Sequence, residues 1–127
     1  MLDPKIRDLC RAKNFATLTT LFADGAPQTN VMWVDCDDDH ILINTEVHRA
    51  KARNVSADPR VSVVIWEAGN PYTYAEVRGR VVESITGDSA RAHIDSLSQR
   101  YTGVDYANPI QSERVILRIA PDRQMVR

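Results

Sequence analysis

The sequence predicts a mainly β domain in which six antiparallel strands curl toward a barrel and short helices flank them. Six segments rich in β-branched and aromatic residues are joined mostly by tight turns. The helical segments are too few and too short to cover both faces of a parallel sheet. The chain has 127 residues, which predicts a single domain over residues 1–127 with one core.

The first half of the chain is predicted to begin with a helix over residues 3–13, because Asp3 can cap it and Pro4 suits its first position. Three strands follow, over residues 15–22, 28–35 and 41–45. A turn at 23–27 contains a glycine, for which positive φ is accessible, and three successive aspartates form a second turn at 37–39. The short connections predict antiparallel neighbours.

The second half is predicted to contain two helices, over 50–57 and 88–101, with Gly103 ending the second. Three further strands are predicted over residues 60–67, 72–84 and 113–120. Gly79 lies inside the longest strand, where a glycine indicates a bulge or bend. We expect Pro121 to end the last strand, because proline cannot donate to a strand ladder.

Charge and hydropathy bound the possible functions. The chain has 16 basic and 17 acidic residues and a net charge of −1, whereas a nucleic-acid or membrane-surface binder usually has a basic excess. No apolar run approaches the ~20 residues of a membrane span, and the N-terminus lacks the apolar core of a signal peptide. We therefore expect a cytoplasmic protein, in which Cys10 and Cys36 are free thiols in the core.

A basic cluster, His48, Arg49, Lys51 and Arg53, lies where a strand is predicted to end and a helix to begin. A helix N-terminus has unpaired N–H groups and a partial positive charge, and it binds anions readily. Arg49 can donate to two phosphate oxygens, Lys51 adds a point charge, and Thr45 supplies a hydroxyl. The cluster is therefore a candidate phosphate site, although a solvated helix face would have the same spacing.

A polar stretch from Gln28 to Asn30 opens a strand that becomes apolar from Val31 onward. An amide side chain on a strand can hydrogen-bond the polar edge of a flat heterocycle. Simple outward-facing polar alternation would look the same.

Three aromatic residues, Trp66, Tyr72 and Tyr74, flank a predicted loop. The two tyrosines lie on the same side of a strand and could line a pocket or stack on a ring. They could also form a dimer interface, where aromatic residues are enriched. Both interpretations hold if the pocket lies between two subunits.

Several catalytic patterns are missing. The sequence has no G-x-G-x-x-G segment, no P-loop and no recognisable Ser or Cys nucleophile motif. The acidic turn before His40 is typical of a solvated hairpin, so we expect no metal site. Hydride transfer remains possible, because a bound cofactor then carries the chemistry and the protein needs no catalytic residue of its own.

Three segments together resemble a known family. They are F-A-T-L-T-T-L-F-A-D-G-A-P-Q-T-N-V-M-W, I-L-I-N-T-E-V-H-R-A-K-A-R-N-V-S-A-D-P-R-V-S-V and N-P-Y-T-Y-A-E-V-R-G-R-V-V-E. They are similar to the pyridoxamine 5'-phosphate oxidase-like superfamily, and within it to the branch of probable deazaflavin (coenzyme F-420)-dependent oxidoreductases. The similarity runs from about Phe15 to Ala120, and the R-A-K-x-R-N and E-V-R-G-R-V segments are its most specific parts.

The resemblance implies a flavin-binding split β-barrel that forms a homodimer with two cofactor sites at the interface. By position, Arg49 and Lys51 match the family's phosphate-binding pair, and the tyrosines match aromatics from the neighbouring subunit. The cofactor-binding residues expected from motifs and resemblance together are Gln28, Asn30, Val31, Asn44, Thr45, Arg49, Lys51, Arg53, Trp66, Tyr72 and Tyr74.

The function implied is transfer of a hydride from reduced coenzyme F-420 to a small organic acceptor. The alternatives are an FMN-dependent oxidoreductase of the same fold and a non-catalytic module that binds a flavin or haem-like ligand. Pyridoxamine phosphate oxidases carry a C-terminal substrate-binding segment rich in Trp and Arg, whereas this chain has no Trp after Trp66. That departure argues against pyridoxamine phosphate as the substrate.

Overall fold

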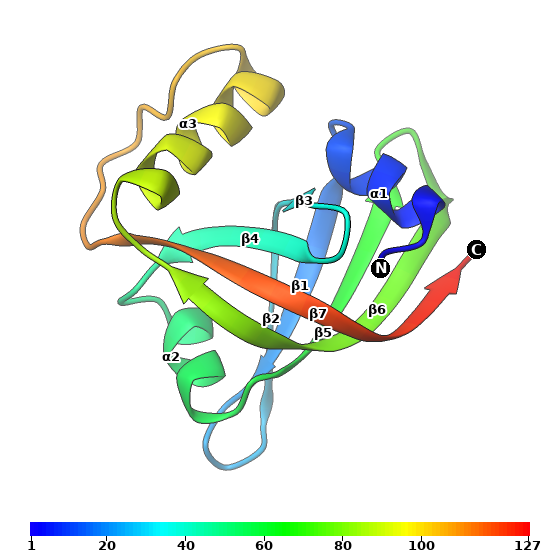
Figure 1. Cartoon of the computed structure of the whole chain (residues 1–127), viewed down its shortest axis with the longest axis horizontal. Coiled ribbons are helices and arrows are strands. Elements are labelled where there is room, and N and C mark those ends of the chain that lie inside the picture. The colour runs from blue at the N-terminus through cyan, green and yellow to red at the C-terminus, as the bar shows by residue number, and fades with distance from the viewer.

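The computed structural model describes residues 1–127 as one antiparallel sheet that curls into a half-barrel, with three helices around it (Figure 1). The strand order is β2-β1-β5-β6-β7-β4-β3. The elements are α1 (Pro4–Arg11), β1 (Phe15–Leu21), β2 (Pro27–Trp33), β3 (Asp35–Cys36), β4 (Ile41–Glu46), α2 (Ala50–Ala57), β5 (Arg60–Glu67), β6 (Asn70–Ile85), α3 (Asp88–Thr102) and β7 (Arg114–Val126). None of these helices combines the length and the apolar character that crossing a membrane requires.

The predicted fold class is confirmed, but the count of six strands was wrong because the sheet has seven. The additional strand is β3, in which Asp35 pairs with Leu42 and Cys36 pairs with Ile41. Asp35 was expected at the end of the preceding strand, which instead ends at Trp33. A two-residue strand is too short to show an alternating pattern, so pairing with β4 alone defines it.

The predicted end of the last strand at Pro121 was also wrong, because β7 continues to Val126. Pro121 lies opposite Gly79, next to a shift in register between Arg78 and Gly79. Proline is tolerated at such a bulge because one ladder hydrogen bond is already absent there. The bulge predicted at Gly79 is confirmed, and a Cβ at this position would lie only 2.1 Å from the Ala120 carbonyl oxygen.

The main core fills the inside of the half-barrel. Along β5, Val61, Val63 and Ile65 are buried, and the residues between them are half-buried. Helix α1 closes one end with Ile6 and Cys10, and the Asp3 carboxylate accepts from Lys5 N (2.8 Å) at its start. Cys10 and Cys36 are both free thiols in this core, as predicted.

Helix α3 forms a second, smaller cluster at the other end of the sheet (Figure 1). Its buried residues Ile94, Leu97 and Tyr101 pack against Trp33 and Tyr106. The helix ends at Gly103 in the left-handed conformation (φ 84°), as predicted. This cluster forms one wall of the cavity described below.

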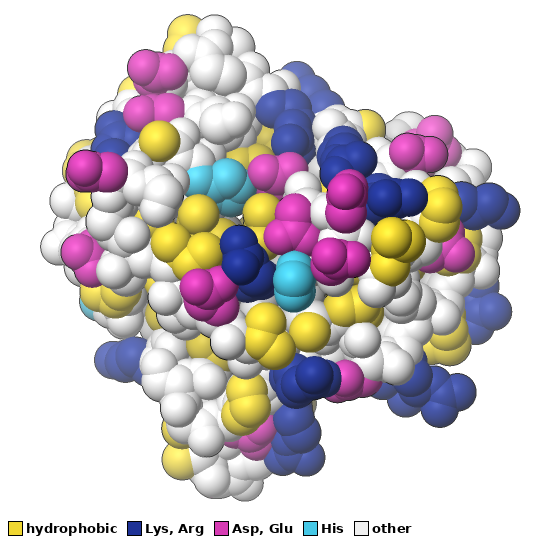
Figure 2. Space-filling model, in the orientation of Figure 1, with side chains coloured by type: hydrophobic (Ala, Val, Ile, Leu, Met, Phe, Trp, Pro, Cys, Tyr) yellow, Lys and Arg dark blue, Asp and Glu magenta, His cyan; other side chains and the backbone are white.

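Basic and acidic side chains are interspersed over the face of the molecule shown in Figure 2. The arrangement agrees with the nearly balanced composition of 16 basic and 17 acidic residues. A local excess of positive or of negative side chains is therefore a candidate sign of a binding site.

Candidate functional site

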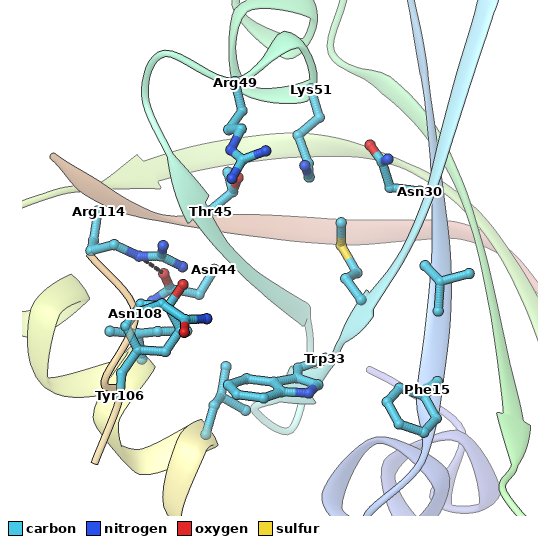
Figure 3. A pocket seen from close by; sticks show the side chains of 14 residues that line it. Phe15, Asn30, Trp33, Asn44, Thr45, Arg49, Lys51, Tyr106, Asn108 and Arg114 are labelled. Carbon is cyan, nitrogen blue, oxygen red and sulfur yellow. Dashed lines mark hydrogen bonds between the residues drawn. The ribbon is translucent and has the colours of Figure 1, made fainter. Parts of the chain in front are cut away.

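A cavity of about 420 Å³ lies between the start of α2, the middle of α3 and strands β1, β2 and β4 (Figure 3). Its size is within the range of small-molecule sites. The residues that line it are Phe15, Asn30, Val31, Met32, Trp33, Asn44, Thr45, Arg49, Lys51, Ile94, Leu97, Tyr106, Asn108 and Arg114.

One end of the cavity is cationic. Strand β4 ends at Glu46, and a turn closed by Arg49 N donating to the Glu46 carbonyl (3.0 Å) leads into α2. Arg49 is the N-cap of α2 and supplies no side-chain cap, so the first N–H groups of the helix remain free for a ligand. Arg49 and Lys51 both extend from this helix start into the cavity, beside Thr45 (Figure 3).

The charged groups at this end influence one another. Burial lowers the pKa of Lys51, and the like charges of Arg49 and Arg114 lower it further. Burial also lowers the pKa of Arg114, which remains charged at neutral pH. Burial alone would raise the pKa of Glu46, but the backbone N–H groups of residues 111–112 (2.7 Å each) and Arg114 outweigh it, so the pKa is lowered.

The opposite end of the cavity is aromatic and apolar. Trp33 stacks on Tyr101, with ring centroids 4.9 Å apart and planes 6° apart, and it meets the Tyr106 ring edge-on. Phe15 lies 5.7 Å from the Tyr101 centroid. The Tyr101 ring is held in place by its hydroxyl, which donates to the Asn14 carbonyl. The rings form a rigid wall suited to a flat ligand.

Six of the predicted site residues lie together in this cavity. They are Asn30, Val31, Asn44, Thr45, Arg49 and Lys51. The other five do not line it. Gln28 lies beside it and donates to the Asn30 side-chain oxygen, whereas Arg53 is exposed on α2.

The three predicted aromatic residues lie on the β5–β6 hairpin, outside the cavity of this chain. Trp66 pairs with Tyr74 across the two strands and lies 6.4 Å from the Phe15 ring. Tyr72 is 84% exposed. A role at the site of a second subunit therefore stays a prediction for these residues.

Several residues of the cavity were not predicted. Trp33 lies on β2 two residues after Val31, so strand alternation could have placed it beside the predicted pair. Tyr106 and Asn108 lie on the loop after α3, and Arg114 is the first residue of β7. No local pattern marks these three, because the return of the chain from α3 brings them to the site.

Comparison with known proteins adds to this geometry. The family model for pyridoxamine 5'-phosphate oxidase matches residues 2–124. The chain belongs to the pyridoxamine 5'-phosphate oxidase family. The membership agrees with the resemblance of the sequence and with the antiparallel half-barrel.

Solved structures similar to this family member have differing descriptions. One, named an F420 reductase, has a TM-score of 0.81 at 30% identity, and the match covers 94% of each chain. A conserved hypothetical protein from Mycobacterium tuberculosis has a TM-score of 0.76 at 27% identity, covering 99% of this chain and 84% of the other. A haem storage protein from Vibrio cholerae shares the fold, with a TM-score of 0.66 at 16% identity, covering 98% and 94%.

Proposed function

We propose that this protein is an oxidoreductase that binds reduced coenzyme F-420 in the cavity and passes its hydride to a small organic acceptor. The observation that carries the proposal is the polarity of the cavity, which joins a cationic helix start to an aromatic wall. A phosphorylated, flat heterocycle complements both ends. Similarity to a structure named an F420 reductase, at 30% identity over 94% of each chain, supports the same cofactor.

The residues present fit such a cofactor. Arg49, Lys51 and the free N–H groups of α2 would hold its phosphate, and the Thr45 hydroxyl would add a donor. Asn30 would hydrogen-bond the polar edge of the ring, and Trp33 would exclude water from its face. When bound, the reduced deazaflavin supplies the hydride, so the chain's own task is to bind, orient and desolvate.

We further propose that two copies of the chain form a homodimer around the sites. Apolar side chains are exposed on and near the edge strand β2, with Val31 64% exposed and Phe15 36% exposed. On the β5–β6 hairpin, Tyr72 is 84% exposed. A second copy that covered these residues would bring Trp66, Tyr72 and Tyr74 toward a cofactor site, the role that the family resemblance implies.

The test of function is turnover. Wild-type protein is mixed with reduced deazaflavin and a panel of acceptors that includes conjugated enones and tetrapyrroles, and oxidation of the cofactor is followed by absorbance. Reduced FMN is run in parallel, because it also presents a phosphate and a tricyclic ring. We expect acceptor-dependent oxidation of the deazaflavin. Tight binding without oxidation across the panel would instead indicate a ligand-binding module.

The alternative of a haem-like ligand can be compared with the residues that line the cavity. Haem iron is usually held by an axial His, Cys, Met or Tyr. Of these residue types, Met32 and Tyr106 line the cavity, whereas none of the three histidines and neither cysteine does, and its polar end is built from cations and amides. These groups favour a phosphorylated ligand. Titration with haem beside deazaflavin and FMN ranks the three ligands directly.

A further inference from the structure

Arg114 is a cation that the folded chain buries almost completely. Its side chain is 7% exposed and lines the cavity. The guanidinium carries five N–H donors, and its Nε donates to Asn44 Oδ1 (2.9 Å). The Glu46 carboxylate lies 3.6 Å from Nη1, beyond hydrogen-bonding distance. A cation this deeply buried is stable only beside groups that balance its charge, and the cavity is the space next to it that an anionic ligand could fill.

A series of hydrogen bonds fixes the direction in which Arg114 points. The Asn44 oxygen accepts from Arg114, and the Asn44 nitrogen donates to the Ala90 carbonyl and to His93 Nδ1, both at 3.0 Å. Because Nδ1 accepts, the ring proton of neutral His93 is on Nε2, which lies 2.9 Å from an Asp35 oxygen. The Asn44 amide therefore has one orientation, and its oxygen faces Arg114.

Two further contacts hold the guanidinium in place. Its central carbon lies 5.1 Å from the centroid of the Tyr106 ring, a cation–π distance. Glu46 lies on another side, but one of its oxygens already accepts two backbone N–H groups from residues 111–112. Figure 3 shows Arg114 beside Asn44 and directly above Tyr106, with Arg49 and Lys51 farther up in the same view. The side chain is thus prepared to bind a ligand at low entropic cost.

Acidic residues of the chain balance only part of the positive charge around the cavity. Arg49, Lys51 and Arg114 line it, no carboxylate does, and Glu46 is the one acid that pairs with any of the three. Close cations repel each other, and after burial, the larger cause, this repulsion further lowers the pKa of Lys51. About two positive charges remain in excess. A phosphate monoester carries about −1.5 to −2 at neutral pH, and a phosphodiester next to a carboxylate carries a similar charge.

We propose that Arg114 is a third anion-binding residue of this site, positioned by Asn44, His93 and Asp35, and that it binds the ligand's phosphate end together with Arg49 and Lys51. The proposal rests on the proposed function in that it takes the cavity to be a phosphate site. It extends that function by assigning the site a ligand with about two negative charges. FMN meets this requirement with a phosphate monoester, and deazaflavin meets it with a phosphodiester and neighbouring carboxylates.

The experiment compares phosphorylated with phosphate-free ligands, using quenching of tryptophan fluorescence. Wild type, Arg114→Gln and Arg114→Lys are titrated with FMN and riboflavin, and with deazaflavin and its phosphate-free form. Arg114→Gln should weaken binding of the phosphorylated ligand about ten- to a hundredfold, while the phosphate-free ligand binds as in wild type. Arg114→Lys should recover part of the loss. Arg118→Gln is the matched control, because Arg118 is on the same strand but pairs with Glu83 outside the cavity.

The positioning role of His93 is measured by the same ratio of affinities. His93→Leu removes the acceptor for Asn44 and should lower the preference for phosphorylated over phosphate-free ligand. His93→Gln, which retains an acceptor, should restore it. A variant with merely loosened structure would bind both ligands less well and leave the ratio unchanged. Melting temperatures show whether each variant is folded.

Two results would overturn the inference, and only the second would also overturn the proposed phosphate site. If Arg114→Gln folds and keeps the wild-type ratio in both ligand pairs, Arg114 does not bind the phosphate end, and the proposal for Arg49 and Lys51 stands. If wild type itself shows no preference for a phosphorylated ligand in either pair, the phosphate site and the role of Arg114 are both wrong.

Discussion

Replacing Lys51 by alanine tests the phosphate end of the cavity most directly. Lys51 is half-buried beside two like charges, so its ammonium gains more from a bound anion than a fully solvated lysine would. A hydrogen bond to a charged group contributes about 1.5–3 kcal/mol. Lys51→Ala should therefore raise the dissociation constant of the cofactor roughly ten- to a hundredfold, at 1.4 kcal/mol per decade.

The fold should tolerate this change. The groups around Lys51 lower its pKa through burial and repulsion, so the folded chain loses no stabilising ion pair when the charge is removed. We expect the free energy of unfolding to change by no more than about 0.5 kcal/mol, because the substitution breaks no ion pair and creates no unpaired buried group. Urea titration of both proteins measures this difference, and calorimetric titration with deazaflavin and with FMN measures binding.

A control on the same helix separates this site from general electrostatics. Arg53 is exposed and does not line the cavity, so Arg53→Ala should bind cofactor nearly as wild type does. Rising salt should weaken the wild type more than Lys51→Ala, because the contact that the variant lacks is the screened one. Should Lys51→Ala and Arg49→Ala both bind like wild type, the cluster is a solvated helix face and the assignment of the site is wrong.

Three further predictions concern the fold, acid stability and assembly. Gly79→Ala should destabilise the protein by about 1–3 kcal/mol in thermal or urea unfolding, because its Cβ would meet the Ala120 carbonyl oxygen at 2.1 Å, and an unchanged stability would show that the bulge relaxes freely. Burial alone would raise the pKa of Asp35, but its histidine and arginine partners outweigh it and lower the pKa, so the stability it contributes is present above pH ~4 and is lost as the pH falls through the lower folded value. In Asp35→Asn, the free energy of unfolding should therefore fall less steeply below pH ~4 than in wild type, and an unaltered acid-unfolding profile would contradict this. Sedimentation should detect a dimer that Tyr72→Asp weakens, whereas a monomer at micromolar wild-type protein would refute the proposed interface.

Local sequence signals determined most of the secondary structure and one end of the candidate site. The bounds of α2 and β5 agree with their predictions, since the patterns and the aspartate and proline between them act within a few residues. Gly103 marks a helix end because its own backbone adopts the left-handed conformation, and Gly79 inside a strand pattern indicated the bulge that the structure shows. The joint position of Arg49 and Lys51 at a helix start also follows from adjacent residues, so the cationic end of the cavity could be predicted.

Tertiary structure alone decided the rest. Arg114 meets Asn44 across 70 residues and Tyr101 meets Trp33 across 68, and no local pattern encodes such contacts. The continuation of β7 through Pro121 depends on Gly79 of the neighbouring strand, which provides the bulge that proline needs. Backbone propensities act between near neighbours, whereas the aromatic wall and the third cation depend on which segments the curled sheet and α3 bring together.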